Sequence, residues 1–203
     1  MPIRSLLARE EQDEYEDAKA QYGRVYKVCG EGKFGICFDL SDGSVAKLHP
    51  SIDYAYHAFA GFCMGLEGEE YAKHFPAISY HKRQIDYSVF IMEKLYRYES
   101  LPKVEQDHVP SILTPNTGSI FDCFKAAEIR FIQAVNEKLG RAASFPAYNK
   151  YKVTPTLEDA FQALLLRVHS SEFCCDLHDY NIMFRRGADG VPTPVIIDPF
   201  TPI

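Results

Sequence analysis

Apolar and polar residues alternate in five short runs within the first half of the chain. This period of two, with many β-branched and aromatic residues, is typical of β-strands. The turn sequence Ser41-Asp42-Gly43 lies between two of the runs and indicates that the first three strands are antiparallel. The five runs are residues 24–28, 36–40, 44–48, 77–84 and 88–95.

Other segments carry apolar residues at helical spacing. An acidic segment at 4–20, ending at Gly23, and an apolar segment at 52–66 predict two helices in the first half. In the second half, residues 119–139 predict a long amphipathic helix. A further helix is expected to open at Thr156, which has the spacing of a capping box with Asp159.

The last part of the chain predicts a small hairpin. Residues 182–184 and 195–197 are short apolar runs, and the glycines at 187 and 190 supply a turn between them. The basic pair Arg185-Arg186 lies on this hairpin, where we expect both side chains to be solvated.

The order of these elements predicts the fold class. Strands come first, helices follow and a hairpin ends the chain, which indicates an α+β fold with two lobes. The proline-containing segment 97–118 is the best candidate for a linker. We therefore expect an N-terminal lobe at 1–96 and a C-terminal lobe at 97–203.

Composition limits the kinds of partner. The chain has 203 residues, 46% of them hydrophobic, with 22 basic and 28 acidic residues and a net charge of −6. This negative balance argues against non-specific binding to nucleic acid or to an anionic membrane, because both need clustered positive charge. The most apolar window, 54–66, is too short to span a bilayer.

Six cysteines lie among apolar or aromatic residues, and none forms a CxxC pair. We expect them to be reduced core residues of a cytoplasmic protein rather than a disulfide or zinc framework. The seven histidines show no zinc-ligand spacing, so a zinc site is not expected.

The first candidate motif is a glycine cluster made of Gly30, Gly32 and Gly35. A dinucleotide-binding fold would place a helix after these glycines, but another strand follows them here. A Walker A loop would need Ser or Thr after Lys33, and Phe34 stands there. Two interpretations remain, a glycine-rich hairpin whose backbone N–H groups cover phosphates, and a plain structural turn.

The second candidate is Lys47, on the strand that follows the hairpin. A lysine that faces the interior needs an anionic partner, because an unpaired buried ammonium group is costly. Nucleotide phosphates under the glycine loop would supply one, and a solvated edge lysine is the alternative.

The third candidate is a set of oxygen-bearing side chains near the end of the chain. Asp176 precedes Asn181 by five residues, and Asp198 ends the last predicted strand. Pairing of the two final strands would bring these residues together. Their oxygens suit Mg²⁺, which leaves Asp176 to accept or orient a hydroxyl proton during phosphoryl transfer. A polar turn is the alternative, because Asp and Asn favour turns.

Together these motifs resemble the protein kinase superfamily over residues 24–198. The resemblance implies a two-lobed fold with a small antiparallel β lobe and a mostly helical C-terminal lobe. It implies that Mg²⁺ and ATP are cofactors, and that backbone groups near Glu93 and Leu95 hold the adenine. It further implies that Asp176 is the catalytic acid–base. The implied ATP ligands are Gly30, Gly32, Gly35 and Lys47, and the implied metal ligands are Asn181 and Asp198.

A closer resemblance is to the early serine/threonine protein kinases of autographivirus-type bacteriophages. It is carried by CDLHDYNIMF at 175–184, IIDPF at 196–200 and YAYHAFAGFC at 54–63. By this resemblance, the chain is a kinase domain that phosphorylates host proteins in the host cytoplasm and helps to shut off host transcription.

The sequence also departs from the kinase pattern. Cys174-Cys175 replaces the usual His-Arg, and His178 stands where most protein kinases have lysine, as in aminoglycoside phosphotransferases. Glu67 is the candidate acidic partner of Lys47, with a solvent-exposed position as the alternative. Two other functions therefore stay open, a small-molecule phosphotransferase and a non-catalytic pseudokinase that binds a host protein.

Overall fold

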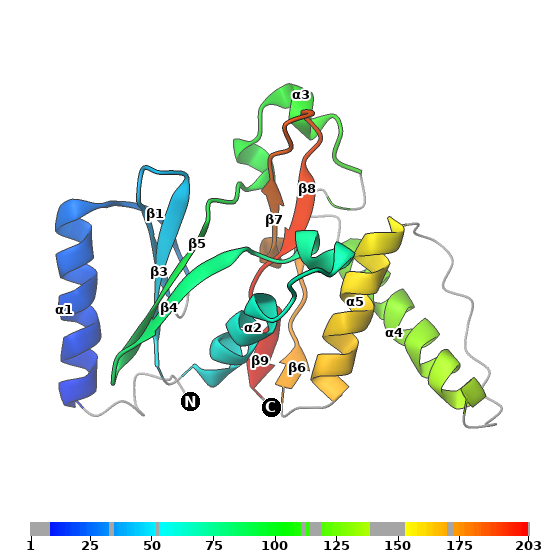
Figure 1. Cartoon of the computed structure of the whole chain (residues 1–203), viewed down its shortest axis with the longest axis horizontal. Coiled ribbons are helices and arrows are strands. Elements are labelled where there is room, and N and C mark those ends of the chain that lie inside the picture. The colour runs from blue at the N-terminus through cyan, green and yellow to red at the C-terminus, as the bar shows by residue number, and fades with distance from the viewer. Residues whose placement is uncertain are drawn as a thin grey trace. The chain divides into compact units, whose positions relative to one another are not determined.

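The computed structural model has an α+β fold and divides into two compact units (Figure 1). The first unit is Met1–Gly65 with Ala77–Lys94, and the second is Leu66–Pro76 with Leu95–Ile203. The segment Leu66–Pro76, which the sequence analysis assigned to the N-terminal lobe, thus groups with the second unit. The described residues are 9–32, 35–51, 53–110, 113, 119–138, 153–169 and 173–202.

A five-stranded antiparallel sheet forms the centre of the first unit, and it confirms four of the five predicted strands closely. The first strand was predicted at 24–28 but runs over Lys27–Glu31, because Arg24 and Val25 belong to the preceding helix. The strand order is β1-β2-β3-β5-β4, so β5 lies between β3 and β4. The strands are β1 Lys27–Glu31, β2 Ile36–Asp39, β3 Ser44–Pro50, β4 Ile78–Arg83 and β5 Tyr87–Glu93.

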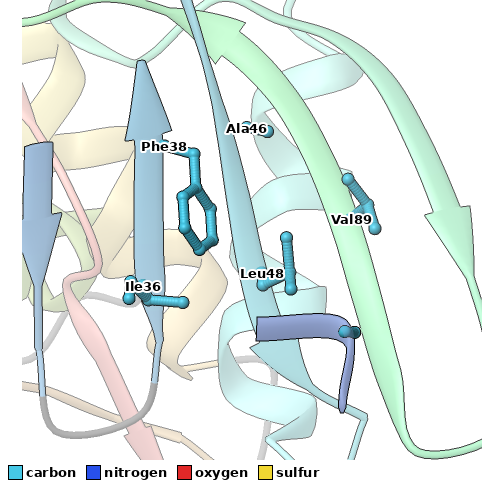
Figure 2. Packing of buried hydrophobic residues seen from close by; sticks show 6 residues of the cluster. Ile36, Phe38, Ala46, Leu48 and Val89 are labelled. Atoms are coloured by element: carbon cyan, nitrogen blue, oxygen red, sulfur yellow. The ribbon is translucent and has the colours of Figure 1, made fainter. Parts of the chain in front are cut away.

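Helix α1 (Arg9–Val25) packs on one face of this sheet. Ala18 of α1 joins a buried cluster with Phe38 of β2 and Leu48 of β3 (Figure 2). The helix was predicted to end at Gly23, but it continues to Val25. Tyr22, in the last turns of the helix, packs its ring 5.5 Å from that of Phe38. This contact in the last turns of the helix outweighs the low helix propensity of glycine.

Helix α2 (Tyr54–Met64) packs on the opposite face of the sheet. Side chains alternate between the two faces along β3, and Lys47 and His49 lie on the face that α2 covers. Asp53 begins the helix as its N-cap, because its Oδ1 accepts the backbone N–H of Tyr56 at 3.2 Å.

The second unit combines helices with two small antiparallel sheets, β6 with β9 and β7 with β8. Helices α4 and α5 pack together through the rings of Phe124 and Phe161, whose centroids are 5.6 Å apart. The helices are η2 Glu70–His74, η3 Tyr98–Ser100, α3 Lys103–Gln106, α4 Ser119–Lys138, α5 Pro155–His169 and η5 Asp179–Asn181. The strands are β6 Phe173–Cys175, β7 Ile182–Arg185, β8 Thr193–Ile196 and β9 Phe200–Pro202.

The start of α5 differs from the predicted capping box. The helix begins at Pro155, and Thr154 caps it by accepting the Leu157 N–H at 3.3 Å. Thr156 instead lies 3.0 Å from the buried His74, through Oγ1 and Nε2. Proline at the first helical position favours this start, because its missing N–H would have no helical partner there.

The basic pair on the last hairpin was expected to be solvated. Arg186 is exposed, as expected, whereas Arg185 is half-buried, and both side chains make contacts within the protein. The Arg185 guanidinium donates to the backbone carbonyls of Lys73 and Phe75 at the end of η2. Arg186 Nε donates to both carboxylate oxygens of Glu105, at 2.8 and 3.0 Å. Glu105 is only 5% exposed and lies in α3, within the segment predicted to be a linker.

All six cysteines are free thiols, as expected. Their predicted burial is correct for Cys123 and wrong for Cys29 and Cys174, which are exposed. No helix in the described part of the chain is long and apolar enough to cross a membrane.

Candidate functional site

The three candidate oxygen-bearing residues of the second unit lie together. The Nδ2 group of Asn181 donates to the backbone carbonyl of Asp176 at 2.7 Å and to that of Asp198 at 3.0 Å. The predicted pairing of the last two strands is confirmed, with Ile182 opposite Ile196. Because both Nδ2 hydrogens of Asn181 are donated to carbonyls, its Oδ1 is the atom left to meet a ligand.

Backbone hydrogen bonds hold this arrangement on both sides. The Ile197 N–H donates to the Asn181 carbonyl at 2.8 Å, and the Asp176 N–H donates to the Pro199 carbonyl at 2.7 Å. Strands β6 and β9, which the sequence analysis did not predict, pair next to these contacts, with Cys175 opposite Phe200.

Asp198 has a left-handed backbone conformation, with φ at +51°. For a residue with a side chain this conformation is strained, and such strain persists only where the surrounding contacts enforce it. Here the Asn181 bond to its carbonyl and the bonds of Ile197 and Pro199 on either side enforce it.

His178 orders the turn between Asp176 and Asn181. Its Nδ1 accepts the backbone N–H of Tyr180 at 3.2 Å, so the neutral ring carries its proton on Nε2. That Nε2 lies 4.0 Å from Oδ2 of Asp176, whose side chain is 57% exposed. The Asp176 carboxylate is thus open to a substrate, with an imidazole donor beside it.

These residues do not form a complete metal cage. Within the described residues, no group of three or more His, Cys, Asp or Glu side chains could hold a metal ion. A carboxylate and an amide oxygen, as on Asp198 and Asn181, are the kinds of ligand that Mg²⁺ takes in nucleotide enzymes, where one or two protein oxygens act with phosphates and water.

The glycine hairpin of the first unit joins β1 to β2, with Gly32 N–H bonded to the Gly35 carbonyl at 2.8 Å. Residues 33 and 34 lie outside the described residues. A Cβ on Gly35 would lie only 2.9 Å from the Leu48 carbonyl oxygen and from His49 Cδ2. The protein's own packing therefore requires glycine at position 35.

Gly30 and Gly32 differ from Gly35. A Cβ on Gly30 would lie 3.8 Å from Cys37 Cβ, and one on Gly32 would lie 3.9 Å from the Gly35 carbonyl oxygen. Both are ordinary contact distances, and neither residue has a positive φ. Neither packing in the described part of the chain nor backbone strain accounts for these two glycines.

The Lys47 side chain points toward α2 and is only partly exposed to solvent. Its Nζ lies 3.4 Å from the centre of the Tyr56 ring, and the side chain is half-buried. His49 stacks on the same ring at 4.5 Å, and burial followed by the Lys47 charge holds the pKa of His49 well below its ordinary value. Glu67 lies in an exposed turn after α2, as the alternative interpretation expected.

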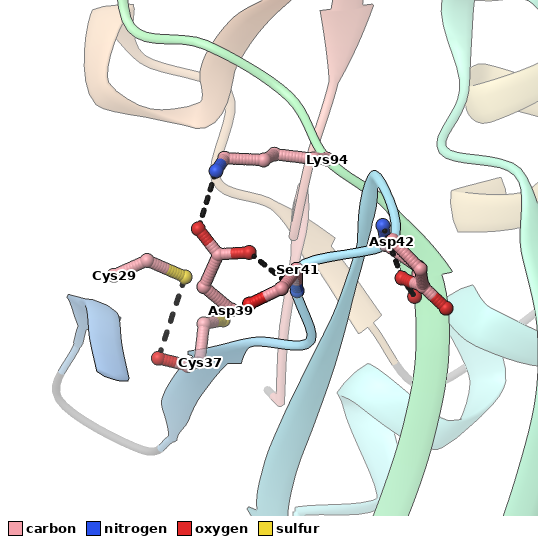
Figure 3. A network of polar contacts seen from close by, with 7 residues as sticks. Cys29, Cys37, Asp39, Ser41, Asp42 and Lys94 are labelled. Carbon is pink, nitrogen blue, oxygen red and sulfur yellow. Dashed lines mark hydrogen bonds and ion pairs between the residues drawn. The ribbon is translucent and has the colours of Figure 1, made fainter. Parts of the chain in front are cut away.

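The segment expected to hold adenine lies at the end of β5. Glu93 exchanges bonds with Ala77, donating its N–H to the Ala77 carbonyl and accepting the Ala77 N–H on Oε1. Lys94 pairs with Asp39, whose pKa it lowers mainly through this hydrogen bond (Figure 3). Leu95 begins the second unit, and its backbone has no hydrogen-bond partner among the described residues.

The candidate residues thus form two groups, each described within its own unit. Gly30, Gly32, Gly35, Lys47 and Glu93 belong to the first unit, and Leu95, Asp176, Asn181 and Asp198 belong to the second. The sequence analysis missed the contact of Tyr56 with Lys47. The sequence pattern does not say which side chain of α2 faces Lys47.

No protein family model matches the chain, and no curated protein is significantly similar to it in sequence.

Proposed function

We propose that this protein is a Mg²⁺- and ATP-dependent phosphotransferase with a protein-kinase-like two-lobed fold that phosphorylates serine or threonine side chains of bacterial host proteins. The observation that carries the proposal is the Asn181 amide, whose two N–H bonds to the Asp176 and Asp198 carbonyls turn its oxygen toward a ligand. The strained Asp198 backbone supports it, because strain of this kind gathers at functional sites.

Each residue has a role in this proposal. Asn181 and Asp198 would hold Mg²⁺, which would neutralise charge on the transferring phosphoryl group. Asp176 would accept or orient the proton of the attacking hydroxyl. Lys47 would bind the α- and β-phosphates, and the main chain at Gly30 and Gly32 would cover them.

One test is phosphoryl transfer from γ-labelled ATP into a bacterial lysate, with and without Mg²⁺. We expect the wild-type chain to label protein bands on serine and threonine, and Asp176→Ala to lose this labelling. Asp159→Ala is the matched control, because Asp159 is an exposed carboxylate on α5. Equal labelling by the wild type and Asp176→Ala would contradict the proposal and favour a non-catalytic binding protein.

A second candidate function is transfer to a small molecule. His178 favours it, because its imidazole lies beside the Asp176 carboxylate where most protein kinases have a lysine. In the same assay, label that stays in the low-molecular-weight fraction and depends on Asp176 would identify this activity.

A further inference from the structure

Two of the six cysteines lie on neighbouring strands at the base of the glycine hairpin. Cys29 belongs to β1 and Cys37 to β2, and both are reduced. Cys29 is exposed and Cys37 is partly exposed, so a small molecule in solution reaches the Cys29 sulfur directly.

The register of the two strands brings these cysteines opposite each other. It shifts between Val28 and Gly30, so Cys29 is the extra residue of a β-bulge. A bulge places two residues of one strand opposite one residue of the other, and Cys37 is the residue that Cys29 and Gly30 share. Opposed residues of antiparallel strands have Cα atoms about 4.5–5.5 Å apart, within the range of about 4.4–6.8 Å that a disulfide spans.

The two thiols also lie on one face of the sheet. The Cys29 thiol donates to the Cys37 carbonyl oxygen, with Sγ 3.5 Å from the oxygen (Figure 3). Burial and then the Asp39 charge raise the pKa of Cys29, and the Lys94 charge lowers it, so these two charged groups lie close to the thiol. Cys37 shares the face of Asp39, because alternate side chains of a strand point the same way.

We propose that Cys29 and Cys37 are a modification site, a dithiol that a low-molecular-weight disulfide oxidises to a disulfide across the base of the hairpin. The Cys29 thiolate attacks one sulfur of the small disulfide, whose S–S bond breaks and releases the first thiol. The Cys37 thiolate then attacks the Cys29 sulfur, and the second thiol leaves. The protein loses two hydrogen atoms with their electrons, and the two released thiols carry them.

The new bond would tie β1 to β2 beside Gly30. Cys37 pairs with Lys47 in the register of β2 and β3, so the bond would form on the sheet face that carries this lysine. The inference does not depend on the proposed function, because the bond forms without nucleotide.

The test treats the folded wild-type chain with oxidised glutathione at about pH 8.5, the ordinary pKa of cysteine, so that thiolate is present. The remaining thiols are then alkylated and the monomer is digested with trypsin. Trypsin cleaves after Lys27, Lys33 and Lys47, so Cys29 and Cys37 fall on separate peptides, 28–33 and 34–47. We expect these two peptides to be joined, with a mass two hydrogen atoms below their sum, and dithiothreitol to separate them.

Cys29→Ser and Cys37→Ser should each lose the joined peptides. Cys174→Ser is the matched control, because it removes the other exposed cysteine, and it should give the wild-type amount of the joined peptides. A wild-type monomer without them, or one in which Cys29 is joined mainly to a cysteine other than Cys37, would overturn the inference. Absence of phosphoryl transfer would instead contradict the proposed function and leave this result unchanged.

Discussion

Asp198 holds a backbone conformation that glycine adopts more easily than any other residue, yet the chain places a carboxylate there. Left-handed backbone costs about 1 kcal/mol or more for a residue with a Cβ. Because strain of this kind gathers at functional sites, we expect the Asp198 side chain to have a chemical role.

The substitution Asp198→Gly separates strain from function. We expect it to raise the free energy of unfolding by up to about 1 kcal/mol, because glycine relieves the positive φ, and to abolish Mg²⁺-dependent phosphoryl transfer. Asp198→Asn should keep wild-type stability and also lose transfer, and Asp198→Ala should lose transfer without the gain in stability. Denaturant unfolding and the labelled-ATP assay measure the two effects. Near-normal turnover in any of the three variants would remove Asp198 from the proposed site.

The hairpin glycines give a second prediction at the residue scale. Gly35→Ala should lower the free energy of unfolding by about 1–3 kcal/mol, because its Cβ would press against the Leu48 carbonyl and the His49 ring. Gly32→Ala should leave stability within about 0.5 kcal/mol of wild type and raise KM for ATP. Thermal unfolding and ATP-dependent rates check both. If Gly32→Ala lost as much stability as Gly35→Ala, the glycine cluster would be only a structural turn.

Among the elements of the first unit, the layer between α2 and the sheet contains two half-buried histidines. His57 of α2 lies 5.5 Å from His81 of β4 between ring centroids, and both rings pack on Phe90 of β5. Their Nε2 atoms are buried and have no hydrogen-bond partner in the described part of the chain. Burial, His81 and Arg83 lower the pKa of His57 from 6.5 to about 4.

The lowered pKa values of these histidines predict that the protein loses stability in acid. Between pH 6.5 and about 4 the unfolded chain takes up a proton at His57 that the folded chain does not, so the free energy of unfolding falls as pH falls through this window. The pKa of His81 is also lowered by burial and Arg83, which adds to the effect. Urea unfolding across this window should show a weaker pH dependence in the double variant His57→Gln/His81→Gln. His108→Gln, which changes an exposed histidine of the second unit, is the control and should keep the wild-type slope.

Considering the whole molecule, the candidate residues belong to two compact units. The proposed function makes Mg-ATP binding depend on residues of both. A ligand that binds only the folded chain raises its melting temperature according to its concentration and affinity.

We therefore expect Mg-ATP to raise the melting temperature of the wild type, and both Lys47→Ala and Asp198→Asn to reduce this increase strongly. The measurement is thermal unfolding with and without Mg-ATP at about 1 mM, which is at the upper end of common KM values. ADP with EDTA is the control for metal dependence. An undiminished increase in either variant would show that nucleotide binding does not need that residue.

The sequence determined much of the secondary structure, because strand alternation and helical spacing depend on residues close together in the chain. Four strands of the large sheet, both long helices of the second unit and the final hairpin were predicted, and that hairpin is what brings Asn181 to Asp198. The first strand was predicted three residues too early, because helix α1 extends to Val25. Two short apolar runs and a turn are enough to predict that Asn181 and Asp198 lie side by side.

The partners of the side chains, in contrast, depend on how the elements pack together. The ring of Tyr56 contacts Lys47, Glu105 pairs with Arg186, and Thr154 rather than Thr156 caps α5. Lys47 and Tyr56 lie on consecutive elements, and the contact depends on which face of β3 the helix covers. Arg186 and Glu105 are 81 residues apart in the chain. The cap depends on His74 engaging Thr156 across the unit. Local pattern carries no information on such pairs, because they depend on which faces pack together and on the cost of leaving a buried polar group unpaired.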